Sequence, residues 1–298
     1  MELTKISDKN YYFASAVNVG YVYEGNRGLL IDAGLDAQAM KKIVKQLKEK
    51  NLPLTHLFIT HAHADHYGGA AFLQKQHAVY TMAPKFEEAI LRYPLLEPLY
   101  LFQGTKPLPS MRTKFLEGPP IVIDEVVEEG PITCGDIQIT CVALPGHSEH
   151  QLAVMSNGYL YATDAYFSVE SLHKHKIPFV VDVDETLESL QTLLQLSCKG
   201  AVPGHGTFEK EFHPTVEANI AYHQEILTRM DNLLQEHSGG LSQEELIYHM
   251  CKLYDIEVSN VGSWMLFRTA ITAYATKLVK DKKATFFIRK AALWIQST

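Results

Sequence analysis

Three histidines and one aspartate are concentrated in residues 60–69, whose sequence is T-H-A-H-A-D-H-Y-G-G. Alternate side chains of an extended loop point the same way, so His61 and His63 can bind one ion. The chain then turns, and Asp65 and His66 can face a second position. Imidazole nitrogen and carboxylate oxygen are ligands that suit zinc and similar divalent metals. The segment therefore predicts a metal site, which we favour over a solvent-exposed loop rich in histidine.

Three further donors, His147, Asp164 and His205, each come just after a predicted strand and lie beside a glycine or another small residue. Those strands are predicted over residues 137–143, 159–162 and 200–202. The 60–69 segment likewise follows an apolar strand predicted over residues 54–60. Because open α/β sheets usually place ligands at the carboxyl ends of their strands, we expect all these donors to meet.

The order H-x-H-x-D-H, then a His, an Asp and a His, resembles the metallo-β-lactamase superfamily of metallohydrolases, and every position of that pattern is filled here. The resemblance covers roughly residues 1–237. It implies a first metal held by His61, His63 and His147, a second held by Asp65, His66 and His205, and Asp164 bridging the two. It also implies an α+β fold, the αββα four-layer sandwich, which the alternation of strands and metal loops fits.

Two divalent ions that share a water would lower its pKa from near 16 to roughly 7 and supply a bridging hydroxide as nucleophile. Asp65 would lie beside that hydroxide and could pass a proton to the leaving atom. We therefore predict a dinuclear metal hydrolase that cleaves an ester-like bond, such as a lactone or thioester, in a small substrate. Relatives that use two irons carry Glu at the position of His63, so the histidine favours zinc, with iron or manganese as alternatives.

Residues 164–170 resemble the corresponding stretch of N-acyl-homoserine lactonases, which place a tyrosine near the bridging aspartate. By counting, Phe167 falls at that position and Tyr166 lies one residue earlier. We take Tyr166, with Asp65, as the candidate catalytic residues. Thioesterases of the glyoxalase II type share the metal set but add basic residues for glutathione near the C-terminus, which we do not match here.

Other polar residues near the predicted loops have supporting roles or none. Asp32 ends a predicted strand and resembles a carboxylate that accepts an N–H from a ligand histidine; a turn aspartate that stabilises its own backbone is the alternative. His150 is expected to support the site, and His173 and His175 to lie at the surface.

Length and composition suit one large domain with a small addition, since the 298 residues are 46% hydrophobic and 20% charged. No apolar run approaches the roughly 18 residues that span a bilayer. The first residues are polar and acidic where a signal peptide has an apolar centre, so we expect a cytoplasmic protein without membrane contact. Its four cysteines show no C-x-x-C pair, and we expect reduced thiols.

The chain divides at Gly239 and Gly240, which follow a helix predicted over residues 212–237. We predict a catalytic domain over 1–237 and a helical extension over 238–298, similar to the winged-helix-like tail of some superfamily members. The extension should begin with a capping box at Ser242 and Glu245. Helices are predicted over residues 244–253, 263–280 and 284–296.

The extension carries a net charge of +3 and the remainder −10. Its basic residues allow a second hypothesis, a metal-dependent nuclease or phosphodiesterase, although an acidic catalytic domain argues against a long polyanion as substrate. A third hypothesis is a non-catalytic metal-binding scaffold. A solvated helical face or a homodimer element would explain the extension equally well.

Residues 93–120 hold six of the thirteen prolines and follow no steady period. A stretch of this kind often forms a lid over a binding site, and a dimer contact or a cover for the core are the alternatives. Its large apolar side chains would line a substrate pocket if it is a lid; they are Tyr93, Leu96, Leu99, Tyr100, Leu101 and Phe102.

Overall fold

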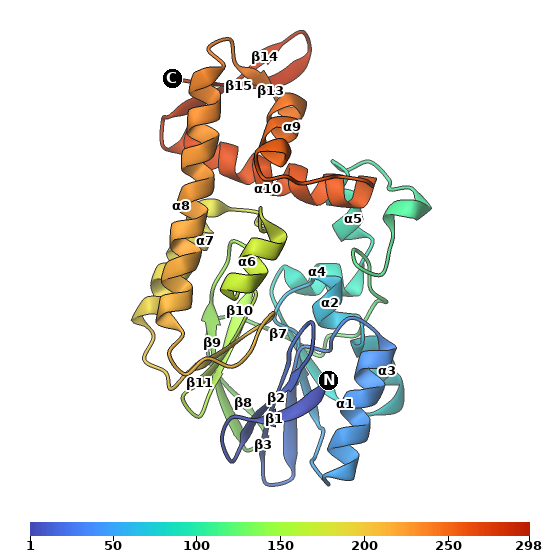
Figure 1. Ribbon diagram of the computed structural model, residues 1–298. Helices are drawn as coiled ribbons and strands as arrows, with labels where there is room; N and C mark the ends of the chain where they lie inside the picture. The colour runs from blue at the N-terminus through green and yellow to red at the C-terminus, as the bar shows by residue number, and fades with distance from the viewer.

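The computed structural model describes residues 1–298, in which two β-sheets pack face to face with helices outside them (Figure 1). The first sheet contains, side by side in chain order, β1 (Glu2–Lys5), β2 (Asn10–Ala14), β3 (Val19–Glu24), β4 (Arg27–Ile31), β5 (His56–Phe58), β6 (Tyr80–Pro84) and β7 (Glu125–Val127). The second has the order β12 (Ala201–Pro203), β11 (Tyr159–Thr163), β10 (Leu152–Ser156), β9 (Ile137–Ala143) and β8 (Gly130–Cys134). Strands β4 to β7 run parallel, as do β11 and β12.

Alternating side chains bury both faces of each sheet. Leu29 and Ile31 of β4 pack between the sheets, whereas Leu30 packs against helices on the outside. In β10, Val154 points into the space between the sheets and Ala153 points to the opposite face. A strand with apolar residues on both faces requires a layer on each side, so the expected αββα sandwich is confirmed.

Helices α1 (Ala37–Glu49), α3 (Ala70–Gln76) and α4 (Glu87–Arg92) cover the first sheet. The second sheet is covered by α7 (Val183–Gln195) and α8 (His213–Glu236). Helix α1 begins where the Asp36 side chain accepts bonds from two backbone N–H groups. Apolar residues at helical spacing predict one apolar face of Met40, Ile43, Val44 and Leu47; the helix buries three of these, and Val44 is half-buried.

The 93–120 segment contains more regular structure than expected, namely α5 (Leu96–Leu101) and a 3₁₀ turn at Pro109–Met111. Leu101 is buried with Met111, Leu116 and Met265 in a small cluster of its own. Tyr93 is 69% exposed. The short helices α2 (Ala64–Tyr67) and α6 (Val169–His175) were also not predicted.

The C-terminal extension contains β13 (Leu241–Ser242), α9 (Gln243–Leu253), α10 (Val261–Lys280), β14 (Ala284–Arg289) and β15 (Ala292–Ser297). The capping box of Ser242 and Glu245 is present. The helix predicted over residues 284–296 is wrong, because this stretch forms a β-hairpin. The run Thr285 to Ile288 favours a strand, and the turn at Lys290 and Ala291 has positive φ angles without the Gly or Asn that usually signals such a turn.

Helix α8 belongs to both parts of the chain (Figure 1). Val216, near its start, packs in the sandwich, whereas Ile226, Met230 and Leu234 pack with α9 and α10. The hydrophobic core of the extension thus includes half of a helix that the predicted boundary assigns to the catalytic domain. No helix has the length and apolarity to cross a bilayer, and all four cysteines are free thiols.

Candidate metal centre

The seven predicted donors meet at the carboxyl ends of four strands, although they come from widely separated parts of the sequence. The stretch after β5 carries His61 and His63 and continues into α2, which carries Asp65 and His66. The other donors follow β9, β11 and β12. Their ligand atoms form three overlapping groups: His61, His63 and His147; His61, His66 and Asp164; and Asp65, His66 and His205, each group lying within 4.8 Å.

Asp164 lies between the two expected metal positions. Its Oδ2 is 3.4 Å from His147 Nε2 and 3.3 Å from His205 Nε2, and its Oδ1 is 3.4 Å from His66 Nε2. Two ligands about 2.05 Å from a tetrahedral ion lie roughly 3.3 Å apart, so these spacings fit donors that surround zinc. The carboxylate can therefore reach both groups of imidazoles.

Hydrogen bonds orient several of the rings. The Nδ1–H of His147 donates to Phe179 O at 2.9 Å, and that of His205 donates to Ala16 O at 2.7 Å. His66 Nδ1 lies 2.8 Å from Asp32 Oδ2, so Asp32 has the role that the sequence suggested. These bonds occupy one ring nitrogen and leave Nε2 with a lone pair for a metal.

Three buried atoms at the centre of the cluster have no hydrogen-bond partner: His61 Nε2, His66 Nε2 and Asp164 Oδ1. Buried polar atoms are almost always paired, so an unpartnered set that converges on one place indicates a missing ligand. Five imidazoles and two carboxylates are the donor types of a zinc site. The residues present therefore fit a divalent metal.

The protonation states of three of the histidines and of Asp164 suit metal ligands. Burial, assisted by the neighbouring imidazoles, lowers the pKa values of His61 and His63 well below the usual range. Burial likewise lowers the pKa of His147. Burial raises the pKa of Asp164, but His205 and His66 outweigh it and hold that pKa well below its usual value. Burial would lower the pKa values of His66 and His205, but Asp164 and the neighbouring carboxylates outweigh it and raise both. A ligand imidazole must be neutral, so metal binding would displace a proton from these two rings.

Two glycines make room for the donors. A Cβ on Gly204 would lie 1.9 Å from Asp164 Oδ1. Gly146 has φ +117°, and a Cβ there would lie 2.3 Å from Thr186 N in α7. The glycine of each Pro-Gly-His sequence is thus required by close packing next to a ligand.

The buried Glu87 of α4 connects two of the donor loops. It accepts bonds from Ala62 N at 2.8 Å, Ser148 Oγ at 2.5 Å and His150 N at 3.0 Å. Burial raises its pKa, and the three donors oppose that effect. This carboxyl group therefore holds the loop of His61 and His63 against the loop of His147.

A family model described as the metallo-beta-lactamase superfamily matches residues 13–205 of the chain. The chain belongs to this superfamily. All seven donors lie within the matched residues, and the extension after α8 lies outside them. Superfamily membership and the donor clusters together support a hydrolase that can bind metal.

The chain is similar to proteins named as a thioesterase and as a hydrolase. An atrochrysone carboxyl ACP thioesterase of Aspergillus fumigatus is 22% identical over 88% of this chain and 75% of its own length. A hydroxyacylglutathione hydrolase of Xanthomonas campestris pv. campestris is 28% identical over 57% of this chain and 52% of its own length. A solved beta-lactamase domain protein from Burkholderia ambifaria has the same fold, with a TM-score of 0.75 and 16% identity over 100% of this chain and 94% of that one.

The cluster of donor side chains opens into a cavity of about 320 Å³. Phe167 and Phe179 form its walls near the donors, and their rings lie 5.7 Å and 5.9 Å from that of His147. The 93–120 segment contributes to the cavity, but through residues other than the six expected; they are Glu97, Phe115 and Leu116.

Tyr166 is not placed as a catalytic residue would be. Its side chain is 1% exposed, and its hydroxyl group donates to Glu209 Oε2 at 3.0 Å. It packs in the core under α7 and does not line the cavity, whereas Phe167 does. The expectation for Tyr166 is therefore corrected: the position next along the chain faces the metal donors, as simple counting suggested.

The sequence missed two residues of the cavity and did not indicate that a third, His175, lines it. His175 is exposed, as expected, and it also lines the cavity. Glu97 is 2% exposed with Oε2 unpartnered, and burial, followed by Asp65 and Glu87, raises its pKa well above the usual range. Leu266 comes from α10 in the extension. No local sequence signal could have found Glu97 or Leu266, since both reach the cavity through tertiary packing.

Proposed function

We propose that this chain is a metal-dependent hydrolase that uses two divalent ions to cleave an ester-like bond in a small substrate, such as a lactone or a thioester. The observation that carries the proposal is the position of Asp164, whose two oxygens lie 3.3 to 3.4 Å from imidazoles of both donor groups. The donor set contains five nitrogens and two carboxylates, which favours zinc over iron or manganese.

Two bound ions would lower the pKa of a shared water toward neutrality and so supply the nucleophile. Asp65 lines the cavity, with Oδ2 3.6 Å from His205 Nε2, and can carry a proton toward the leaving atom. Phe167 and Phe179 exclude water around the donors. Glu97 offers the substrate a polar contact beside the apolar side chains of Phe115, Leu116 and Leu266.

The residues that line the cavity favour a substrate that is uncharged and partly apolar. Phe115, Leu116 and Leu266 lie among its lining residues, and no Lys or Arg does. An acyl group fits such walls, whereas a phosphate-rich substrate would find no cationic side chain there beyond the proposed metal ions. The names of the thioesterase and hydroxyacylglutathione hydrolase relatives support the same class of bond.

The nuclease alternative receives little support. In the extension, Lys277 and Lys280 form ion pairs with Asp182 and Asp184, which neutralises part of the basic surface. A gel-shift and cleavage test with single-stranded RNA and DNA at low salt addresses this alternative directly. Binding and metal-dependent cleavage there, without turnover of esters, would replace the proposal.

The test compares metal content and turnover of the wild type, Asp164→Ala and Asp8→Ala. We expect about two zinc ions per chain in the wild type and loss of at least one in Asp164→Ala, with activity reduced more than about 100-fold. Asp8 is a matched control because its side chain is 94% exposed and pairs only with Lys5.

The activity assay uses a panel of lactones, thioesters, carboxylic esters and phosphodiesters. Turnover of carboxylic substrates that chelator abolishes and zinc restores would support the proposal. Well under one metal ion per chain in protein prepared without chelator would refute it, as would full activity in Asp164→Ala. Metal binding without turnover of any panel member would favour the non-catalytic scaffold.

A further inference from the structure

The segment that joins α6 to α7 turns sharply at Lys176. This residue has φ 62° and ψ −58°, and Ile177 N donates to His175 O at 2.7 Å. These angles and this hydrogen bond are those of the classic γ-turn, which is rare and strained, above all for a residue with a Cβ. Pro178 disfavours a helical conformation at Ile177, so the change of direction after α6 falls on Lys176 alone.

The strained turn lies in one wall of the cavity above the metal donors. Three residues beside it line that cavity, namely His175, Pro178 and Phe179. The Phe179 ring is 5.9 Å from that of His147, and the carbonyl oxygen of Phe179 accepts the hydrogen bond from His147 Nδ1. A change in the turn would therefore move a group that orients a predicted metal ligand.

Two contacts from outside the donor loops hold the turn. The hydroxyl group of Tyr222, in α8, donates to Lys176 O at 2.8 Å. Lys176 Nζ donates to Asp255 O, in the loop after α9, at 2.6 Å. Glycine would adopt the same backbone angles with little strain, but it would lose the bond to Asp255. A lysine at this position thus accepts the strain and keeps a bond to the C-terminal extension.

Both ends of this wall are fixed as well. Phe167 N and Phe167 O bond the buried side-chain amide of Asn219, in α8, at 2.9 and 2.7 Å. At the other end, Val181 N donates to Gly146 O at 2.8 Å, next to His147. The wall therefore extends from α8 to the loop that carries His147, and the turn in its middle determines how it meets that loop.

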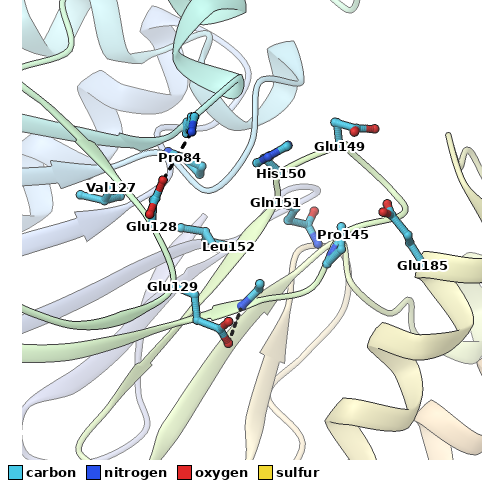
Figure 2. A pocket seen from close by; sticks show the side chains of 12 residues that line it. Pro84, Val127, Glu128, Glu129, Pro145, Glu149, His150, Gln151, Leu152 and Glu185 are labelled. Carbon is cyan, nitrogen blue, oxygen red and sulfur yellow. Dashed lines mark hydrogen bonds and ion pairs between the residues drawn. The ribbon is translucent and has the colours of Figure 1, made fainter.

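The loop of residues 145–151 is incompletely packed on its other side. A second cavity, of about 370 Å³, borders it there, and Figure 2 shows Pro145 and Gln151 among the side chains that line this cavity. Residues beside a cavity lack packing contacts on that side. The bonds that the loop makes with Phe179 O and Val181 N therefore contribute more to its position than they would in a fully packed site.

We propose that Lys176 is a positioning residue for the metal centre. Its strained turn, held by Tyr222 and Asp255, keeps the carbonyl group of Phe179 within reach of His147. Helix α8 and the C-terminal extension thereby help to set the metal affinity, although they supply no ligand. This inference rests on the metal binding of the proposed function, but it does not depend on which bond is hydrolysed.

The test first removes the hydroxyl group of Tyr222 and then removes the strain. In Tyr222→Phe the turn can relax, so we expect zinc affinity, measured by competition with a chromophoric chelator, to fall by about 10-fold. In Tyr222→Phe/Lys176→Gly the turn needs neither contact to hold it, and affinity should return to within about 2-fold of the wild type. If Tyr222 only stabilised the fold, a glycine at another position would not compensate for its loss.

Three further variants complete the comparison. Tyr248→Phe removes the hydroxyl group of a tyrosine that is 60% exposed, and it should leave zinc affinity unchanged. Lys290 has a φ of 51° in the β14–β15 turn, and adding Lys290→Gly to Tyr222→Phe should not restore affinity. Lys176→Ala loses the bond to Asp255 but keeps the strained angles, so it should weaken zinc binding by about 3-fold.

Hydrogen exchange in the metal-free protein, followed by NMR, needs neither zinc nor substrate. The amides of Ile177 and Val181 report on the turn and on its contact with Gly146. Both should exchange about 10-fold faster in Tyr222→Phe and at close to the wild-type rate in the double variant. If the wild type bound no zinc, the proposed function would fail, and these rates would still show whether Tyr222 and the strain control the wall.

Three outcomes would overturn the proposal. The first is a folded Tyr222→Phe that binds zinc and exchanges these amides as the wild type does. The second is a double variant that remains as weak as Tyr222→Phe. The third is equal recovery of affinity with Lys290→Gly in place of Lys176→Gly.

Discussion

Replacing Glu87 with Gln tests whether this buried carboxylate positions the metal loops. Its oxygens accept three bonds, from Ala62 N, Ser148 Oγ and His150 N, at 2.5 to 3.0 Å. A glutamine keeps one oxygen, so at least one backbone N–H then faces an NH₂ group. Each hydrogen bond to a charged group contributes about 1.5–3 kcal/mol, and we expect the folded state to lose roughly 2–4 kcal/mol.

The same change should weaken the metal site, because Ala62 lies between His61 and His63 and Ser148 follows His147. Removing a group that orients ligands typically costs about 10–100-fold in metal affinity. We would measure the unfolding temperature of the metal-free protein and the zinc dissociation constant by competition with a chromophoric chelator. The unfolding temperature should fall by roughly 3–6 °C for a chain of this length.

Glu88→Gln is the matched control. Glu88 is the next residue of α4, but its side chain is 26% exposed and pairs with Arg92 at the surface. Surface pairs contribute about 0–1 kcal/mol, so this variant should resemble the wild type. If Glu87→Gln and Glu88→Gln gave the same unfolding temperature and the same zinc affinity, Glu87 would not have the positioning role assigned to it.

Three further predictions concern other parts of the chain. Gly204→Ala should abolish metal binding, checked by elemental analysis, because the new Cβ would lie 1.9 Å from Asp164 Oδ1. Tyr166→Phe should keep kcat/KM within about 2-fold, whereas Phe167→Ala should raise KM by about 10-fold, since only the latter side chain lines the cavity. Burial lowers the pKa of His223 to about 4 from 6.5. The unfolded chain therefore takes up that proton first, and stability that is complete above pH 6.5 is lost as pH falls toward 4, by about 3 kcal/mol. His223→Phe should flatten this dependence in urea unfolding between pH 7 and 4.5, and an unchanged slope would contradict the assignment.

The donor set could be predicted from sequence because its members occupy comparable local positions. Each donor follows a strand with a clear apolar pattern, and His147 and His205 each follow the dipeptide Pro-Gly. Strand ends of one sheet meet at one edge, and the loop after β5 of the first sheet lies at the same edge of the sandwich as the loops after β9, β11 and β12 of the second, so local patterns imply a shared location. Asp32 could be assigned a supporting role for the same reason, since it ends β4 and reaches His66.

The side chains after Asp164 could not be assigned from alternation. Thr163 has a φ of 49°, unusual for a β-branched residue, and the pairing of β11 with β12 shifts register between Tyr161 and Thr163. The backbone therefore changes direction just before Asp164. Beyond this point, the alternation of side chains along β11 no longer predicts which side chain faces the metal donors. Tyr166 consequently points to Glu209, and Phe167 lines the cavity.

The walls of the substrate cavity depend on how distant parts of the chain pack together. Arg268 of α10 donates to Leu101 O at 3.2 Å, and Met265 packs with Leu101 and Leu116. These contacts join the C-terminal extension to the 93–120 segment, and Leu266 and Leu116 then face the same cavity. Changes in the extension can therefore alter which substrate fits without touching a metal donor. In the proposed enzyme, the residues at the strand ends would determine the reaction, and residues of α5 and α10 would determine which substrate fits. Substitutions could therefore change one without changing the other.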